Sequence, residues 1–161
     1  MCGLLGFIHT TGIDPDQVSS SISQIARRGP DHIGLTQIDQ GSCFAHARLS
    51  IIDLSEKGHQ PYHFEHLVIT FNGMIYNHRP LRDELRKSGY SFESSSDTEV
   101  LIKAWHLWGP KALAKLDGFF SIGLYDRKER CLFLCRDKIG KNRSIGENGV
   151  AGWHSHLDWT R

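Results

Sequence analysis

The feature that most constrains the fold of this chain is a pair of apolar runs joined by a short polar turn. Residues 118–126 read GFFSIGLYD, residues 130–137 read RCLFLCRD, and the polar turn covers residues 127–130. Aromatic and branched side chains on both sides of such a turn are typical of a β-hairpin. The sequence therefore predicts antiparallel strands here, and further strands are expected at residues 3–9, 33–38, 42–47 and 67–72.

Helices are expected in groups between these strands. Asp14 offers an N-cap for a helix that ends near Arg28. Three more helices are expected, over residues 80–87, from residue 96 onward and over residues 110–116. Ser96, with Glu99 three residues later, has the spacing of a capping box. Runs of strands with grouped helices favour an α+β layered architecture over a doubly wound sheet.

The composition is that of one globular domain. The chain has 161 residues, of which 39% are hydrophobic, and Lys and Arg total 19 against 18 Asp and Glu. Because no basic run with interleaved aromatic residues occurs, nucleic acid is not expected as a partner. The start MCGLLGFIHT lacks a positive n-region and has only a short apolar stretch, so neither a signal peptide nor a membrane span is expected.

The cysteines indicate a reducing compartment. Their spacing fits neither a secreted disulfide framework nor a paired zinc ribbon, and they are Cys2, Cys43, Cys131 and Cys135. A cytoplasmic protein without a cofactor or metal is therefore expected. In an alternative interpretation, Cys131 and Cys135 bind zinc together with His154 and His156. Core packing on one face of a strand explains the two cysteines more simply.

Cys2 is the first candidate for catalytic chemistry. Removal of Met1 would leave a cysteine that carries its own α-amine, so that nucleophile and base share one residue. An α-amine and a thiol ordinarily have pKa values of about 8 and about 8.5, so such a pair can exchange a proton near neutral pH. Taken alone, position 2 is better explained by a cysteine that is merely a small buried hydrophobic residue.

Seven motifs in order give Cys2 a context. They are MCGLLGF, RRGPDHIG, HARLSIID, FNGMIYN, SSDTE, LDGFFSIGLYD and LFLCRDKIG. Together they resemble the glutaminase domain of glutamine-hydrolysing asparagine synthetase, over residues 1–141. This domain is a class II glutamine amidotransferase of the N-terminal nucleophile hydrolase superfamily. The resemblance implies a four-layer sandwich of antiparallel β-sheets between α-helices, incomplete at its C-terminus.

The resemblance also implies a reaction. Cys2 would attack glutamine, form a γ-glutamyl thioester and release glutamate and ammonia, as the ammonia-supplying half of an asparagine synthetase-like enzyme. His46, within HARLSIID, is assigned no catalytic role, because the α-amine already supplies a base and a histidine near the end of a strand is more often structural. The alternative is a degenerate, non-catalytic fragment that retains the fold.

By the same resemblance, Arg48 of HARLSIID would hold the α-carboxylate of glutamine. A planar guanidinium can bind a carboxylate through two parallel hydrogen bonds. Nearby groups would assist, namely those of Leu49, Ser50, Ile51 and Ile52. The competing interpretation of Arg48 is a surface ion pair.

Asn72 and Gly73 of FNGMIYN would form the oxyanion hole. The Asn72 side-chain amide and the Gly73 N–H would then stabilise the tetrahedral intermediate. The competing interpretation is a plain Asn-Gly hairpin turn.

Asp97 of SSDTE would bind the α-ammonium of the substrate, and its competing interpretation is helix capping. Met74 belongs to the implied substrate site but departs from the family, which usually has a glutamate at this position. Glutamine binding about ten- to a hundredfold weaker is therefore expected, because a charged hydrogen bond contributes roughly 1.5–3 kcal/mol.

The larger departure begins after Lys141. Residues 142–161 resemble nothing in the family, and a frameshift or premature stop is the leading explanation. Strands without partners would leave open sheet edges, through which the chain could self-associate. Nothing resembles the pyrophosphate loop of the synthetase half or a Walker loop, so the expected partners are glutamine and a separate synthetase domain.

Overall fold

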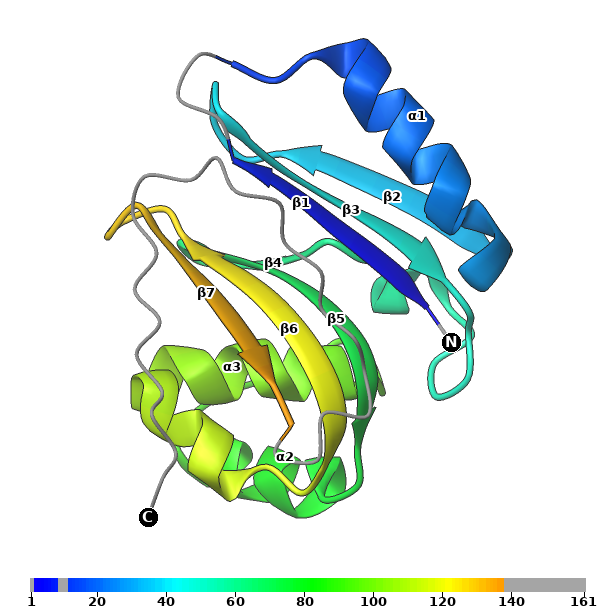
Figure 1. Cartoon of the computed structure of the whole chain (residues 1–161). Helices are drawn as coiled ribbons and strands as arrows, with labels where there is room; N and C mark the ends of the chain where they lie inside the picture. The colour runs from blue at the N-terminus through cyan, green and yellow to red at the C-terminus, as the bar shows by residue number, and fades with distance from the viewer. Residues whose placement is uncertain (1, 9–11, 138–161) are drawn as a thin grey trace.

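The structure is a computed structural model that describes residues 2–8 and 12–137. In these residues the secondary structure forms four layers. One helix lies on the outer face of a three-stranded sheet, and this sheet packs face to face on a four-stranded sheet whose far side carries the other two helices (Figure 1). The α+β sandwich of antiparallel sheets between helices, expected from the sequence, is confirmed.

The first sheet contains β1 (Gly3–Ile8), β3 (Ser42–Arg48) and β2 (His32–Gln37), in that spatial order, with both neighbouring pairs antiparallel. Helix α1 (Pro15–Ile25) covers it and continues into a 3-10 turn, η1 (Ala26–Arg28). The side chain of Asp14 accepts a hydrogen bond from the Asp16 N–H at 3.0 Å, so the expected N-cap is present. The expected helix therefore forms, with a tighter last turn.

The second sheet has the order β4 (Tyr62–Phe64), β5 (Leu67–Ile75), β6 (Gly118–Asp126) and β7 (Cys131–Arg136), all antiparallel. The hairpin expected at residues 118–137 is confirmed as β6 and β7. Strand β4 was not predicted, because three residues are too few to show an alternating pattern. Two more 3-10 turns, η2 (Glu56–Gly58) and η3 (Gly109–Lys115), lie in the connections.

Helices α2 (His78–Lys87) and α3 (Asp97–Trp108) form the outer layer on the second sheet. The Ser96 side chain caps α3 by accepting the Glu99 N–H at 3.2 Å. The reciprocal half of the expected capping box is absent. The Glu99 carboxylate instead accepts the N–H groups of Glu93 and Ser94 and the Ser94 hydroxyl, and it pairs with the Lys103 ammonium at 2.5 Å. Glu99 thus ties the loop before α3 to the helix.

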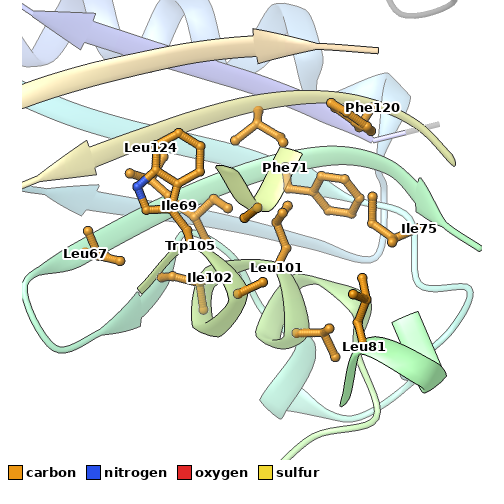
Figure 2. Close-up of a cluster of buried hydrophobic side chains, with 14 of the residues drawn as sticks. Leu67, Ile69, Phe71, Ile75, Leu81, Leu101, Ile102, Trp105, Phe120 and Leu124 are labelled. Carbon is orange, nitrogen blue, oxygen red and sulfur yellow. The ribbon is translucent and has the colours of Figure 1, made fainter. Parts of the chain in front are cut away.

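The main hydrophobic core lies between the second sheet and these two helices (Figure 2). Alternate residues of β5 and β6 point toward α3, where Trp105 and Leu101 fill the space between them. The labelled cluster includes Leu67, Ile69, Phe71, Ile75, Leu81, Leu101, Ile102, Trp105, Phe120 and Leu124. Because the side chains of a strand alternate, the other residues of β5 face the first sheet.

A smaller cluster joins the two sheets. Phe44 from β3 packs with Val68 from β5 and Tyr125 from β6, and its side chain is 1% exposed. A Cβ on Gly6 would come within 3.1 Å of the Phe44 ring, and one on Gly123 within 3.6 Å. The aromatic ring therefore occupies space that these glycines leave between the sheets.

Two sequence-based interpretations fall at least partly outside the described residues. The tail at residues 142–161 lies there, as do two of the alternative zinc ligands, His154 and His156. Within residues 2–8 and 12–137, no group of three or more potential ligands could hold a metal ion. Cys135 packs against the main core, and burial raises the pKa of its thiol to about 11.

In the described residues, no helix is long and apolar enough to cross a membrane.

Replacement of Phe44 by alanine should destabilise the packing of sheet on sheet. The free energy of unfolding is expected to fall by about 3–5 kcal/mol, as for other buried phenylalanines. Urea unfolding of both proteins measures this change. Leu134→Ala, at a side chain that is 50% exposed on β7, is the matched control and should change stability by less than about 1 kcal/mol. Equal effects of the two substitutions would contradict the assignment of Phe44 as the contact between the sheets.

Candidate active site

Every site residue expected from the sequence except Ser50 lines one pocket between the two sheets. These residues are Cys2, Arg48, Leu49, Ile51, Ile52, Asn72, Gly73, Met74 and Asp97. The Ser50 N–H instead donates to the Asp31 carboxylate at 2.7 Å and helps to hold the loop after β3. The pocket is also lined by residues that the sequence analysis did not select, including His46, Asp53, Gly58 and Gln60.

Strand pairing brings Cys2 to this pocket. Gly3 pairs with Ala47, so Cys2 lies beside the end of β3. Its Sγ accepts the Leu49 N–H at 3.3 Å and lies 3.6 Å from the Leu49 carbonyl oxygen, to which the thiol donates. The sulfur is thereby placed by the backbone of the loop that follows Arg48.

Arg48 is buried, with 6% of its side chain exposed. Its guanidinium donates to the Ser55 carbonyl at 2.9 Å and to the Asp53 carbonyl. The alternative interpretation of a surface ion pair is therefore wrong. A guanidinium carries five N–H groups and these bonds use two of them, so donors remain for a carboxylate ligand. A Cβ on Gly58 would collide with the same guanidinium, so a side chain at this position would displace the Arg48 side chain.

The Asp53 carboxylate holds the loop that Arg48 contacts. It accepts hydrogen bonds from the Ser55 hydroxyl at 2.6 Å and the Ser55 N–H at 2.8 Å, and from the Ser95 N–H at 2.8 Å. These donors, the Ser55 hydroxyl first, hold the pKa of Asp53 well below its usual range. Asp53 thus joins the loop after β3 to the loop before α3, and both loops border the pocket.

Asn72 and Gly73 lie in the middle of β5, where they pair with Ser121 and Phe120 of β6. The alternative interpretation as an Asn-Gly hairpin turn is therefore wrong. By strand alternation, Asn72 is on the face of β5 that is turned to the first sheet. A Cβ on Gly73 would lie 2.1 Å from the Phe119 carbonyl oxygen, so the backbone approaches β6 too closely for any other residue.

Asp97 is the first residue of α3 but not its cap, because Ser96 has that role. The Asp97 carboxylate accepts the Ile75 N–H of β5 at 3.0 Å and is 5% exposed. Burial raises the pKa of Asp97, although the Ile75 N–H acts in the opposite direction. Ser96 rather than Asp97 is thus the N-cap, although the Asp97 carboxylate also accepts N–H groups of the first turn, and Asp97 lines the pocket with Met74.

His46 and Gln60 both contact Phe71, the residue before Asn72. The His46 ring is completely buried, and its Nε2 lies 3.1 Å from the Phe71 carbonyl oxygen. Gln60 Oε1 accepts the Phe71 N–H at 2.6 Å. Burial lowers the pKa of His46 to about 4, with nearby Arg48 and His32 acting in the same direction. His46 lay within a recognised motif, whereas no local signal pointed to Gln60.

Comparison with known proteins shows the family of this chain. A family model described as a glutamine amidotransferase domain matches residues 1–143. Asparagine synthetase 1 (glutamine-hydrolysing) of Bacillus subtilis is 37% identical over 147 residues, which cover 87% of this chain and 23% of that protein. Asparagine synthetase B (glutamine-hydrolysing) of Escherichia coli is 35% identical over 145 residues, which cover 87% of this chain and 26% of that protein. The chain thus spans about a quarter of the length of these curated relatives.

A solved structure shows the same fold. Glutamine phosphoribosylpyrophosphate amidotransferase from B. subtilis, in complex with ADP and GMP, superposes with a TM-score of 0.69. The match covers 85% of this chain and 37% of that one, at 18% sequence identity. The likeness in structure therefore covers most of this chain although the two sequences have diverged.

The buried His46 should make stability depend on pH. Because its pKa falls from 6.5 to about 4 on folding, only the unfolded chain takes up this proton between those values. The free energy of unfolding should therefore drop as the pH falls through this window, by about 3 kcal/mol from this residue. Urea unfolding at pH 7 and pH 4.5 tests the effect. His46→Gln, which cannot titrate, should show a smaller loss between the two pH values, and equal losses would disprove the assignment.

Proposed function

Because this chain belongs to the glutamine amidotransferase domain family, we propose that it hydrolyses the side-chain amide of glutamine, with Cys2 as the nucleophile. The proposal rests on one observation, namely that Cys2, Asn72, Gly73, Arg48 and Asp97 all line the same pocket. The fold thus brings together a candidate nucleophile and candidate oxyanion donors from distant parts of the sequence. It adds two side chains of opposite charge, which could bind the α-carboxylate and the α-ammonium of an amino acid.

Arg48 and Asp97 would orient the substrate. A free amino acid carries a carboxylate and an ammonium on one carbon, and these two side chains offer the opposite charges. Both are at least nine-tenths buried and are held by backbone groups of neighbouring segments, so their positions are set before a ligand arrives. The side-chain amide of the bound glutamine would then extend toward Cys2.

The first chemical step would be attack of the Cys2 sulfur on the amide carbon. A carbon–sulfur bond forms, and the carbonyl oxygen becomes an oxyanion that the Asn72 amide and the Gly73 N–H stabilise. Once Met1 is removed, the α-amine of Cys2 takes the thiol proton and passes it to the leaving nitrogen. The carbon–nitrogen bond then breaks, ammonia leaves, and a γ-glutamyl thioester remains.

Water would complete the cycle. The same α-amine takes a proton from water as the hydroxide attacks the thioester, and the oxyanion forms again in the same place. Collapse of this intermediate breaks the carbon–sulfur bond, releases glutamate and returns the proton to sulfur. The scheme consumes one water per glutamine and leaves the protein unchanged.

The ammonia would be passed to a synthetase domain, whether on the same polypeptide or on a separate one. The proposal comes from the curated relatives, which are named as glutamine-hydrolysing asparagine synthetases and are about four times as long as the matched segment. We also propose a cytoplasmic location, because the spacing of the cysteines indicates a reducing compartment.

A non-catalytic amidotransferase domain is the competing proposal, and two observations favour it. Met74 lines the pocket where a second carboxylate would help to hold the substrate ammonium, and Arg48 already donates to two loop carbonyls. Such a domain would keep the fold and bind glutamine weakly or not at all. Measurement of turnover separates the two proposals.

Glutamate release from glutamine is the decisive measurement. Protein whose loss of Met1 is verified by intact mass should release glutamate, and Cys2→Ala should abolish the release. Cys131→Ala is the matched control, since this cysteine lies at the start of β7 outside the pocket, and it should keep the parental rate. No release by the parent, or equal release by Cys2→Ala, would reject the proposed function.

Met74→Glu should strengthen glutamine binding. A carboxylate at this position would share the substrate ammonium with Asp97, and a charged hydrogen bond contributes roughly 1.5–3 kcal/mol. The KM for glutamine is expected to fall by about ten- to a hundredfold, since each 1.4 kcal/mol is about tenfold. Met74→Gln has nearly the same length without the charge and should change KM much less. If both variants behave alike, Met74 does not border the ammonium site.

A further inference from the structure

One edge of β5 runs past the end of its neighbouring strand. Strand β4 pairs with β5 only from Leu67 to Ile69, whereas β5 continues to Ile75. Residues of an antiparallel strand direct their N–H and C=O groups alternately to either side. The Phe120 N–H and C=O both bond to Asp137, at 3.1 and 2.9 Å. Gly73, the partner of Phe120, therefore directs its own N–H and C=O away from β6.

Side chains take the place of the missing strand on this edge. At Phe71, Gln60 accepts the N–H at 2.6 Å and His46 Nε2 bonds the carbonyl oxygen at 3.1 Å. At Ile75, Asp97 accepts the N–H at 3.0 Å. Gly73 lies between these two positions on the same edge, and it lines the pocket. The peptide groups on either side of the candidate oxyanion donor are thus held by side chains.

The two side chains at Phe71 come from different layers. His46 belongs to β3 of the first sheet and is completely buried. Gln60, 7% exposed, also donates from Nε2 to the Thr98 hydroxyl of α3 at 3.1 Å. The backbone of a single residue of β5 is therefore connected to the first sheet through His46 and to helix α3 through Gln60.

The tautomer of the His46 ring follows from its hydrogen-bond partner. A carbonyl oxygen only accepts, so Nε2 carries the proton and Nδ1 is the unprotonated nitrogen. Nδ1 has no hydrogen-bond partner within residues 2–8 and 12–137. A buried acceptor without a partner lowers stability, a cost that a phenylalanine of similar size would avoid. The bond to the Phe71 carbonyl is the interaction that a histidine offers here and a phenylalanine lacks.

We propose that His46 and Gln60 are positioning residues that clamp the backbone of Phe71 on both sides of its Cα and thereby hold the Asn72 amide and the Gly73 N–H in place for the oxyanion. The inference rests on the proposed glutamine hydrolysis and extends it to two residues that need not touch the substrate. Stabilisation of an oxyanion depends on donors fixed before the reaction, so a shift of about 1 Å can reduce the rate about a hundredfold.

The test compares variants that remove or keep the bonds to Phe71. His46→Phe and Gln60→Met fill similar space without the bonds, whereas His46→Gln retains an N–H donor. We expect kcat for glutamine to fall about 10- to 100-fold in the first two, with little change in KM, and to recover in part in His46→Gln. Thr70→Val, at a buried neighbour of Phe71 whose hydroxyl lacks a partner in the described chain, is the matched control and should keep the parental kcat.

A second measurement separates a positioning role from loss of structure. An aldehyde analogue of glutamine adds reversibly to the Cys2 thiol, and the resulting oxygen occupies the oxyanion site. Alkylation of Cys2 by iodoacetamide forms a thioether and needs no such site. Affinity for the aldehyde should fall in parallel with kcat, while the alkylation rate stays close to that of the parent. Unchanged kcat in His46→Phe, or equal losses of aldehyde binding and alkylation, would overturn the proposal.

The outcome remains decisive if the parent protein releases no glutamate. That result rejects the proposed function, and hydrogen exchange of the Phe71 amide then tests the clamp without turnover. Faster exchange in His46→Phe than in Thr70→Val would support a clamp that acts on the Phe71 backbone. Equal exchange in these variants and the parent would overturn it.

Discussion

The packing of one antiparallel sheet on another determines where the polar side chains of the site lie. Alternation along β3 directs Phe44, His46 and Arg48 to the space between the sheets, and alternation along β5 does the same for Asn72. Phe44 fills this space with apolar contacts at one end, and the pocket opens at the other. The same strands thus provide both the contact that joins the sheets and the walls of the site.

Buried carboxylates organise the loops around the pocket by accepting backbone N–H groups. Asp53 holds two loops together, Glu99 holds the turn before α3, and Asp97 holds the end of β5. Hydrogen bonds from N–H groups favour the charged form of a carboxylate, and they help to lower the pKa of Asp53 and of Glu99. At Asp97 burial has a larger effect on the pKa than the hydrogen bonds have, so the pKa of this carboxyl group is raised rather than lowered. Asp97 also lines the pocket.

Local signals in the sequence predicted most of the fold, because caps and turns depend on residues close together in the chain. Asp14 and Ser96 cap their helices as expected, whereas β4 is too short to show a period. For the site, the motifs located the pocket residues but could not indicate their partners. Gln60 bonds residues 11 and 38 positions away, and no periodic pattern connects such distant groups. The prediction that Glu99 completes a capping box was wrong for the same reason, because tertiary partners compete for its carboxylate.

The order of pairing in the two sheets has a consequence for how the chain folds. Cys2 is synthesised before the other residues of the pocket, but Gly3 pairs with Ala47, and Gly73 pairs with Phe120. Chain entropy must be lost before such non-local contacts form, which makes them slow. No nascent chain that ends before β6 contains the complete pocket, which includes Phe119. Cys2 is therefore made before the residues that complete its pocket, and the proposed hydrolysis of glutamine could begin only after β6 has paired with β5.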